Sequence, residues 1–172
     1  MPKENFGNVE ITYDMLAYKA KRFGNNFIDS IICYAIVLVI GEFGNLLYAN
    51  YGYDGLAIGN LESSLEKFNL LYIVISTMYY GLFESFSART PAKHITGTKV
   101  VMRDGTKPDS TAILIRTLCR LIPFEAFSFL FGQFAIGWHD SISKTLVVDI
   151  NKYNSALQKK GGTDTKGDDE AN

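Results

Sequence analysis

The sequence has few of the residues that build metal centres and disulfide frameworks. Its 172 residues include two cysteines and two histidines, whose spacing matches no metal-binding pattern. Cys33 and Cys119 lie inside apolar or amphipathic segments. We therefore expect small buried or lipid-facing side chains without a disulfide, and we predict neither a metal ion nor a cofactor.

The sequence also lacks an excess of one charge and any catalytic signature. Lysine and arginine number 17 against 18 aspartate and glutamate residues, which argues against nucleic acid as a partner. A Ser–His–Asp arrangement, an HExxH pair and a phosphate-binding P-loop are missing, so we predict no enzyme activity. Residues 1–16 contain no basic region followed by an apolar run, so no cleavable signal peptide is expected.

What the sequence does have is one long apolar run. Residues 27–48 are apolar apart from Asp29, Glu42 and a few small polar residues, and a helix needs about 20 such residues to cross a bilayer. Arg22 lies two helical turns before Asp29, which places both within roughly 20° of each other on the helix surface. A charge inside lipid costs roughly 2.5–3.5 kcal/mol or more, so this pair indicates a specific role.

Two interpretations of these charges stay open. Arg22 and Asp29 form an ion or proton site inside the membrane, or they are structural. In the structural version, Arg22 reaches the headgroups and an arginine from another segment neutralises Asp29. Glu42, next to Gly41 and close to Gly44, points to nearly the opposite face. It is either a second site or a group that reaches the outer interface.

Residues 68–86 form the second predicted span. Glu84 lies near its cytoplasmic end, and Tyr80, Ser76 and Tyr72 precede it at intervals of four, which gives a polar stripe on one helix face. This stripe indicates either a hydrated path through the helices or hydrogen bonds between helices, which are common for serine and tyrosine in membranes.

The third apolar segment, residues 112–138, is interrupted by Pro123. Its first half is amphipathic, and Arg116 and Arg120 share one face. They are candidate partners of the carboxylates at positions 29, 84 and 140, or ligands of anionic lipid phosphates. The second half, after the proline, is about 15 residues long, which is short for a simple span.

Two short strands flank this third segment. Thr98–Met102, followed by an Asp-Gly turn, and residues 145–150 have strand patterns. Neither can stand alone, so we expect them to pair on the same side of the membrane. Residues 151–172 are rich in Lys, Gly and Asp, and we predict a disordered tail.

Positive charge predicts the topology. Lysine and arginine number four before the first span, one in residues 49–67 and five in residues 87–111. The positive-inside rule therefore puts the N-terminus and residues 87–111 in the cytoplasm. The C-terminal segment adds five more lysines, so it should also be inside, and residues 112–138 should cross an even number of times. The predicted fold class is an all-α membrane protein with two clear transmembrane helices, a third kinked amphipathic or re-entrant segment, and a small cytoplasmic β element.

Several stretches, taken in order, resemble the RDD family of small prokaryotic membrane proteins, which is named for one arginine and two aspartates. They are RFGNNFID at 22–29, YYGLFE at 79–84, RTPAK at 89–93, TGTKVVMRDG at 96–105, IRTLCRLIPFEAFSF at 115–129 and GWHDSISKTLVVD at 137–149. The resemblance covers residues 17–150, between a lead-in at 1–16 and the tail. It implies that the family's arginine and two aspartates are Arg22, Asp29 and Asp140, and that the protein lies in the cytoplasmic (inner) membrane as a multi-pass protein.

One position departs from the family pattern. The family's T-P-G-K turn reads T-P-A-K here, with Ala92 in place of glycine. A turn that needs a positive φ at this position would be strained by alanine.

Two functions follow as hypotheses. The resemblance implies transport of a small ligand or ion, most sharply Na⁺/H⁺ exchange. Asp29, Glu84 and Asp140 would take up the proton or Na⁺, and Arg22, Arg116 and Arg120 would tune their charge. So few membrane segments imply a homo-oligomer. Supporting roles are assigned to Glu42, Tyr80, Arg89, Lys93 and His139. Alternatively, the same charges hold the helices together in a structural protein that binds lipid headgroups or a partner.

Overall fold

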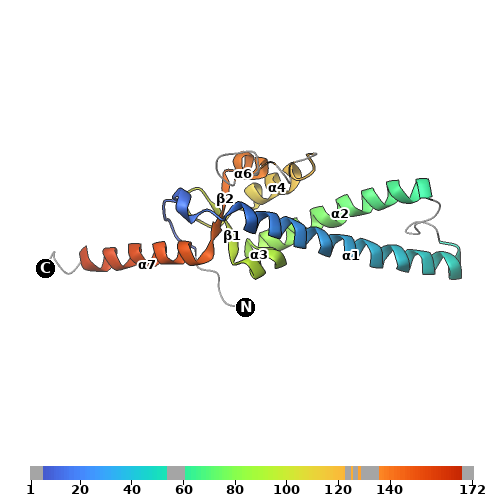
Figure 1. Ribbon diagram of the computed structural model, residues 1–172, viewed down its shortest axis with the longest axis horizontal. Coiled ribbons are helices and arrows are strands. Elements are labelled where there is room, and N and C mark those ends of the chain that lie inside the picture. Colours follow the sequence, from blue (N-terminus) through green and yellow to red (C-terminus); the bar gives the residue numbers. More distant parts are fainter. Residues whose placement is uncertain (1–5, 54–60, 123–124, 126–127, 129–135, 168–172) are drawn as a thin grey trace.

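The computed structural model describes residues 6–53, 61–122, 125, 128 and 136–167. It is mostly helical and contains one two-stranded antiparallel sheet (Figure 1). In chain order the elements are η1 (Tyr13–Met15), α1 (Lys19–Tyr51), α2 (Leu61–Ser87), α3 (Pro91–Thr96), β1 (Thr98–Met102), α4 (Ser110–Cys119), α6 (Trp138–Ser143), β2 (Thr145–Asp149) and α7 (Ile150–Gly167).

The predicted first span is part of helix α1. This helix has 33 residues, which is about 50 Å at 1.5 Å per residue, and it ends where Gly52 adopts a left-handed conformation. Its best apolar window has a mean hydropathy of 1.9, and only 22% of that window is buried inside the protein. Among the described residues, α1 is the one helix long and apolar enough to cross a membrane.

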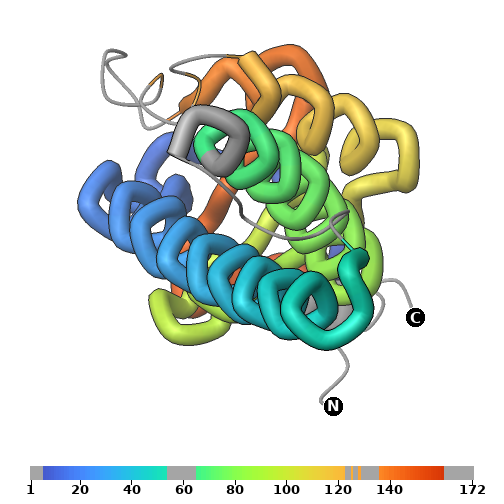
Figure 2. The backbone as a smooth tube through the Cα atoms, turned by 90° about the vertical axis from the view of Figure 1, so that its right-hand side faces the viewer, coloured from blue at the N-terminus to red at the C-terminus, as the bar shows by residue number. Residues whose placement is uncertain are grey.

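The predicted second span lies within α2, which runs back antiparallel to α1 (Figures 1 and 2). Asn69, Glu84 and three tyrosines dilute its apolar content, and it does not reach the hydropathy of a spanning helix. The two helices touch through aromatic rings, since Tyr34 stacks on Tyr72 at 4.5 Å between centroids. That α2 crosses a membrane therefore stays a prediction.

The predicted pairing of the two short strands is confirmed. Strands β1 and β2 are antiparallel, with Val100 opposite Val147 at the centre of the register. The N-terminal segment adds to the edge of this sheet, because Leu16 forms a bridge to Val148 and the amide of Ala17 donates to the carbonyl of Val147 at 2.9 Å. Residues before α1 are thus packed on the sheet.

The predicted tail differs from the structure, in which residues 151–167 belong to helix α7. Tyr153 and Leu157, one helical turn apart, pack on the apolar side chains of Val101 and Val148. The Tyr153 hydroxyl donates to the carbonyl of Gly105 at 2.6 Å. Two well-placed apolar residues are enough to dock a helix whose composition otherwise indicates disorder. Residues 168–172 lie outside the described part.

The third segment begins as predicted and then leaves the described part of the chain. Helix α4 starts at the N-cap Asp109, whose carboxylate accepts from the amide of Ala112 at 2.7 Å, and it ends before Pro123. Of residues 123–135, the structure describes Glu125 and Ser128 only. The prediction of a re-entrant second half therefore lies outside the described residues.

Candidate functional site

A set of buried charges joins five elements where α1 begins and α2 ends. We call it the charged cluster. Its members are Arg22 on α1, Glu84 on α2, Lys93 on α3, Arg116 and Arg120 of the α4 segment, Glu125, and His139 and Asp140 on α6. All are buried except Arg120, whose side chain is 12% exposed. The surrounding elements are gathered around the first turns of α1 in Figure 1. Helices α1 and α2 project away from this region toward the viewer in Figure 2.

Arg116 is the centre of the charged cluster. Its side chain is fully buried, and it bridges two carboxylates: Nε donates to Glu84 Oε2 at 3.0 Å, and one terminal nitrogen donates to Asp140 Oδ1 at 2.6 Å. The same nitrogen also donates to the hydroxyl of Thr145. A guanidinium can serve several acceptors at once because its donors lie in a fixed plane, so this one side chain ties α2 to α6 and β2.

Glu84 receives three cations. Besides Arg116, it accepts from Lys93 and, at 3.2 Å, from Arg120. The Arg120 guanidinium also lies over the Tyr80 ring, 3.9 Å from its centroid. Burial lowers the pKa of Lys93 to about 8, although the Glu84 charge opposes this shift. Lys93 is therefore the cation of this group that gives up its charge most easily.

Asp140 receives two arginines. Arg22 reaches its Oδ2 at 2.5 Å, Arg116 reaches its Oδ1, and the amide of Gly137 donates at 3.0 Å. Burial alone would raise the pKa of Asp140, but the charges of Arg22, His139 and Arg116 outweigh burial and hold the pKa well below its usual range. The carboxylate is thus firmly ionised.

His139 lies between two carboxylates. Its Nδ1 contacts Glu125 Oε1, and its Nε2 is 3.2 Å from Asp140 Oδ1. Glu125 was not among the predicted site residues. It stands inside the quoted family stretch at 115–129, but it follows a proline in an apolar run, and nothing in the local pattern links it to a histidine 14 positions later.

Asp29 has a different environment. It is 1% exposed, and its partners are neutral: the hydroxyls of Tyr79 and Thr90 each donate to it at 2.6 Å, and the amide of Ala92 donates at 3.3 Å. No cation lies within ion-pair distance of Asp29 in the described part of the chain. The expectation that an arginine from another segment neutralises Asp29 is therefore wrong.

The T-P-A-K stretch forms the first turn of α3. Thr90 is its N-cap, Pro91 its first residue, and Lys93 donates its amide to the Thr90 hydroxyl at 3.4 Å. Ala92 is helical and fully buried, so it needs no positive φ, and the strain considered for alanine here does not arise. The positive φ in this region belongs to Ala88 and to Gly97 after α3.

The structure separates the other predicted site residues. Arg22 and Asp29 share the buried face of α1, but Arg22 pairs with Asp140. Arg89 donates to the carbonyls of Thr98 and Lys93, outside the charged cluster. Glu42 is exposed near the far end of α1.

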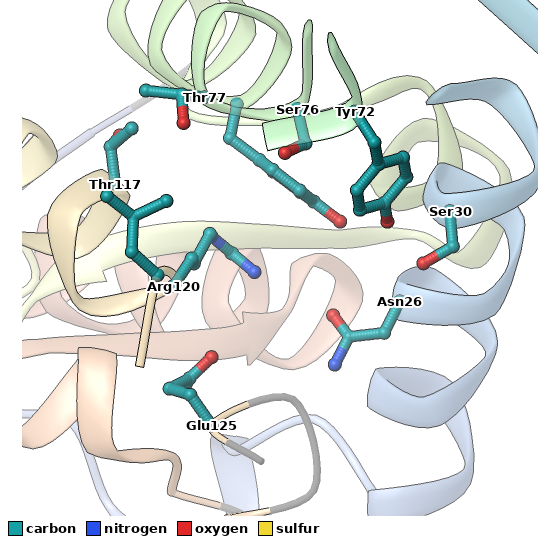
Figure 3. A pocket seen from close by; sticks show the side chains of 10 residues that line it. Asn26, Ser30, Tyr72, Ser76, Thr77, Thr117, Arg120 and Glu125 are labelled. Atoms are coloured by element: carbon teal, nitrogen blue, oxygen red, sulfur yellow. The ribbon is translucent and has the colours of Figure 1, made fainter. Parts of the chain in front are cut away.

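A polar cavity of about 110 Å³ adjoins the charged cluster. Helices α1, α2 and the α4 segment line it (Figure 3). The lining residues are Asn26, Ser30, Tyr72, Ser76, Thr77, Tyr80, Thr117, Arg120, Leu121 and Glu125. Three of them, Tyr72, Ser76 and Tyr80, are the polar stripe predicted on the second helix.

Comparison with protein families matches the RDD family over residues 16–147. No curated protein and no solved structure matches significantly. The family match covers most of the chain, including Arg22, Asp29, Asp140 and every contact between them and α2, α3 and α4 described above. The chain is a member of the RDD family.

Proposed function

We propose that the protein is a multi-pass membrane protein in which α1 and α2 form a transmembrane hairpin. Exposed apolar side chains on both helices support this: among them are Leu38, Val39 and Phe43 on α1, and Leu70 and Met78 on α2. An apolar surface of this extent needs a nonaqueous neighbour. In this topology anionic lipids surround the hairpin. Two spans are few for a complete transport path, so we also propose that the protein is a homo-oligomer.

The proposed orientation has the sheet in the cytoplasm. The sheet, α3 and the start of α7 lie at the end where α1 begins (Figure 1), and the basic residues Lys19, Lys21 and Arg22 lie at that same end. Lys21 also binds Asp149 of β2 at 2.6 Å. By the positive-inside rule, this end of the hairpin and both termini face the cytoplasm.

Within this topology we propose transport of a small ion, with exchange of Na⁺ for H⁺ at Asp29. The observation that carries the proposal is that Asp29 is buried with neutral partners alone. Protonating Glu84 or Asp140 would strand buried arginines, at roughly 3–5 kcal/mol. Protonating Asp29 strands no cation, because none pairs with it in the described part of the chain. The Thr90 hydroxyl can then turn from donor to acceptor and keep its hydrogen bond to the protonated carboxyl group.

The test is ion flux in liposomes. Purified full-length protein is reconstituted with an internal pH dye, and Na⁺, K⁺ or Li⁺ is added outside. We expect a cation-driven pH change that is lost in Asp29→Asn. An exposed carboxylate on α2 supplies the control, since Glu66→Gln should retain the flux. Exchange at the wild-type rate in Asp29→Asn would remove Asp29 from the mechanism.

A second function, in a different class, is favoured by the saturation of Glu84 and Asp140. Between them these two carboxylates bind four cations and tie five elements together, which is the arrangement of a structural core. A structural protein would then recruit lipid headgroups or a partner. Absence of flux for every cation, with folded and inserted wild-type protein, would favour this function over transport.

A further inference from the structure

Two opposite charges line the polar cavity without pairing to each other. Arg120 and Glu125 both face it, and in Figure 3 their side chains approach the same space from different sides. They make no ion pair in the described structure. Two opposite charges on one partly enclosed cavity attract a ligand that carries both signs.

Arg120 keeps one donor unused. One terminal nitrogen binds Glu84 and the guanidinium covers the Tyr80 ring, but Nε is buried and finds no hydrogen-bond partner among the described residues. An unmet N–H on a guanidinium is costly to bury, because charged donors lose strong hydrogen bonds to water. An oxyanion in the cavity would supply the missing acceptor.

Glu125 keeps one acceptor unused. All the hydrogen bonds that the described residues give to it, from His139 and Ser128, end on Oε1. The second oxygen remains available to a donor. An ammonium group suits it, since a carboxylate accepts most strongly from a charged N–H.

The rest of the lining is neutral and adaptable. Asn26, Ser30, Ser76 and Tyr72 present amide and hydroxyl groups to the same space (Figure 3). Such groups can both donate and accept, although the Ser76 hydroxyl already donates to the carbonyl of Ile73 at 3.1 Å. A cavity of about 110 Å³ has room for several waters or one small solute. They provide polar contacts without a net charge that would favour one ion.

We propose that this cavity binds a small zwitterion, with its oxyanion on Arg120 and a primary ammonium on Glu125. Two sources carry that chemistry. One is a free solute of the amino-acid or phosphoethanolamine kind, and the other is the headgroup of an ethanolamine phospholipid. The site is separate from Asp29, which does not line the cavity, so it stands whether or not Asp29 exchanges ions.

The first experiment is calorimetric titration of the full-length protein in detergent with phosphoethanolamine, phosphocholine and inorganic phosphate. Phosphoethanolamine should bind at least about tenfold more tightly than phosphocholine, whose quaternary nitrogen has no N–H to donate. It should exceed inorganic phosphate by a similar factor. Equal affinity for phosphocholine or for phosphate would overturn the assignment of Glu125.

The lipid source is tested by thermal unfolding in micelles doped with phosphatidylethanolamine or phosphatidylcholine. A higher melting temperature with the ethanolamine lipid, without binding of soluble phosphoethanolamine, assigns the site to the lipid. Binding of the soluble probe without a lipid effect assigns it to a free solute. No response in either experiment refutes the proposal.

Variants locate the binding in the cavity. Ser76→Leu places a larger side chain in the cavity wall and should weaken the response about tenfold or more. Val74→Leu adds apolar volume on the exposed face of the same helix and should leave binding unchanged. Glu125→Gln removes the negative charge and should bring phosphoethanolamine down to the affinity of phosphocholine. If Ser76→Leu melts at the same temperature as the Val74→Leu control and still binds the ligand as the wild-type protein does, the ligand binds outside this cavity.

Discussion

Arg22 and Asp29 lie two turns apart on the same buried face of α1, yet each is held by a different part of the chain. Arg22 forms an ion pair with Asp140 on α6. Asp29 accepts hydrogen bonds from Tyr79 on α2 and from Thr90 and Ala92 at the start of α3. One helix face therefore carries an ion pair and, next to it, a carboxylate held by neutral hydrogen-bond donors. Neutralising the aspartate should affect stability differently at the two contacts.

The first prediction is that neutralising the two aspartates has unequal effects on stability. Asp140→Asn leaves Arg22 and Arg116 under-compensated in a buried site and should cost roughly 3–5 kcal/mol. Asp29→Asn should cost about 1 kcal/mol or less. Asparagine keeps the acceptor for Tyr79, and its amide can donate to the Thr90 hydroxyl. Equilibrium unfolding in one detergent, followed by circular dichroism, measures both.

The comparison contains its own control, because the substitutions are chemically identical. Equal losses at both positions would mean that Asp29 depends on a cation after all. A small loss at position 29 also matters for the transport test, since absence of flux in Asp29→Asn could then not be attributed to an unfolded protein.

Local patterns predicted much of the fold. The apolar run at 27–48 predicted the long helix, and a short strand pattern followed by an Asp-Gly turn predicted β1. The pairing of β1 with β2 followed from a physical requirement, namely that neither strand is stable alone. Such features depend on residues close together in sequence, where periodicity and turn chemistry carry the information.

The partners of the charges could not be predicted in the same way. Arg22 and His139 are separated by 117 positions, and the sequence offers several carboxylates for every arginine. For Arg116 and Arg120 the sequence left open the carboxylates at positions 29, 84 and 140 and the phosphates of anionic lipids. In the structure they bind Glu84 and Asp140. The arginine partner expected for Asp29 in the structural interpretation was wrong, because periodicity does not show that a threonine at a helix N-cap will bind a distant carboxylate.

A second prediction concerns the turn that holds the N-terminal segment. Gly105 has φ +81°, and a Cβ there would lie 2.6 Å from the carbonyl oxygen of Val9 and 2.9 Å from that of Gly7. Gly97 has a similar φ of +67° but open space around it. Gly97→Ala should cost about 1–2 kcal/mol from backbone strain. Gly105→Ala should cost about 1–3 kcal/mol more from overpacking.

Thermal unfolding of the two variants isolates the steric part, because both carry the backbone strain. Gly105→Ala should also expose the N-terminal segment, whose Val9 amide donates to the carbonyl of Asp104 at 3.0 Å. Faster proteolysis near this segment in Gly105→Ala than in Gly97→Ala is the expected sign. Identical melting temperatures would contradict the close packing.

The last prediction is a rise in stability with pH that depends on Lys93. Its pKa is about 8 in the folded protein, where burial is the main cause, against 10.5 for an ordinary lysine. Between these values the unfolded chain binds a proton that the folded protein has released, so the free energy of unfolding increases with pH. The slope is at most about 1.4 kcal/mol per pH unit.

Lys93→Met separates this contribution from the other titrating groups, because methionine keeps the apolar stem and cannot titrate. Unfolding should be measured from pH 7 to 9.5, below the range in which Tyr153, whose pKa is raised by burial, would act with the opposite sign. The wild-type protein should gain stability above pH 8 relative to the variant. After Lys93 loses its proton, Glu84 still pairs with Arg116 and Arg120. The contact between α2 and the α4 segment is therefore retained. Parallel pH profiles for the two proteins would mean that Lys93 stays charged and that its pair with Glu84 outweighs its burial.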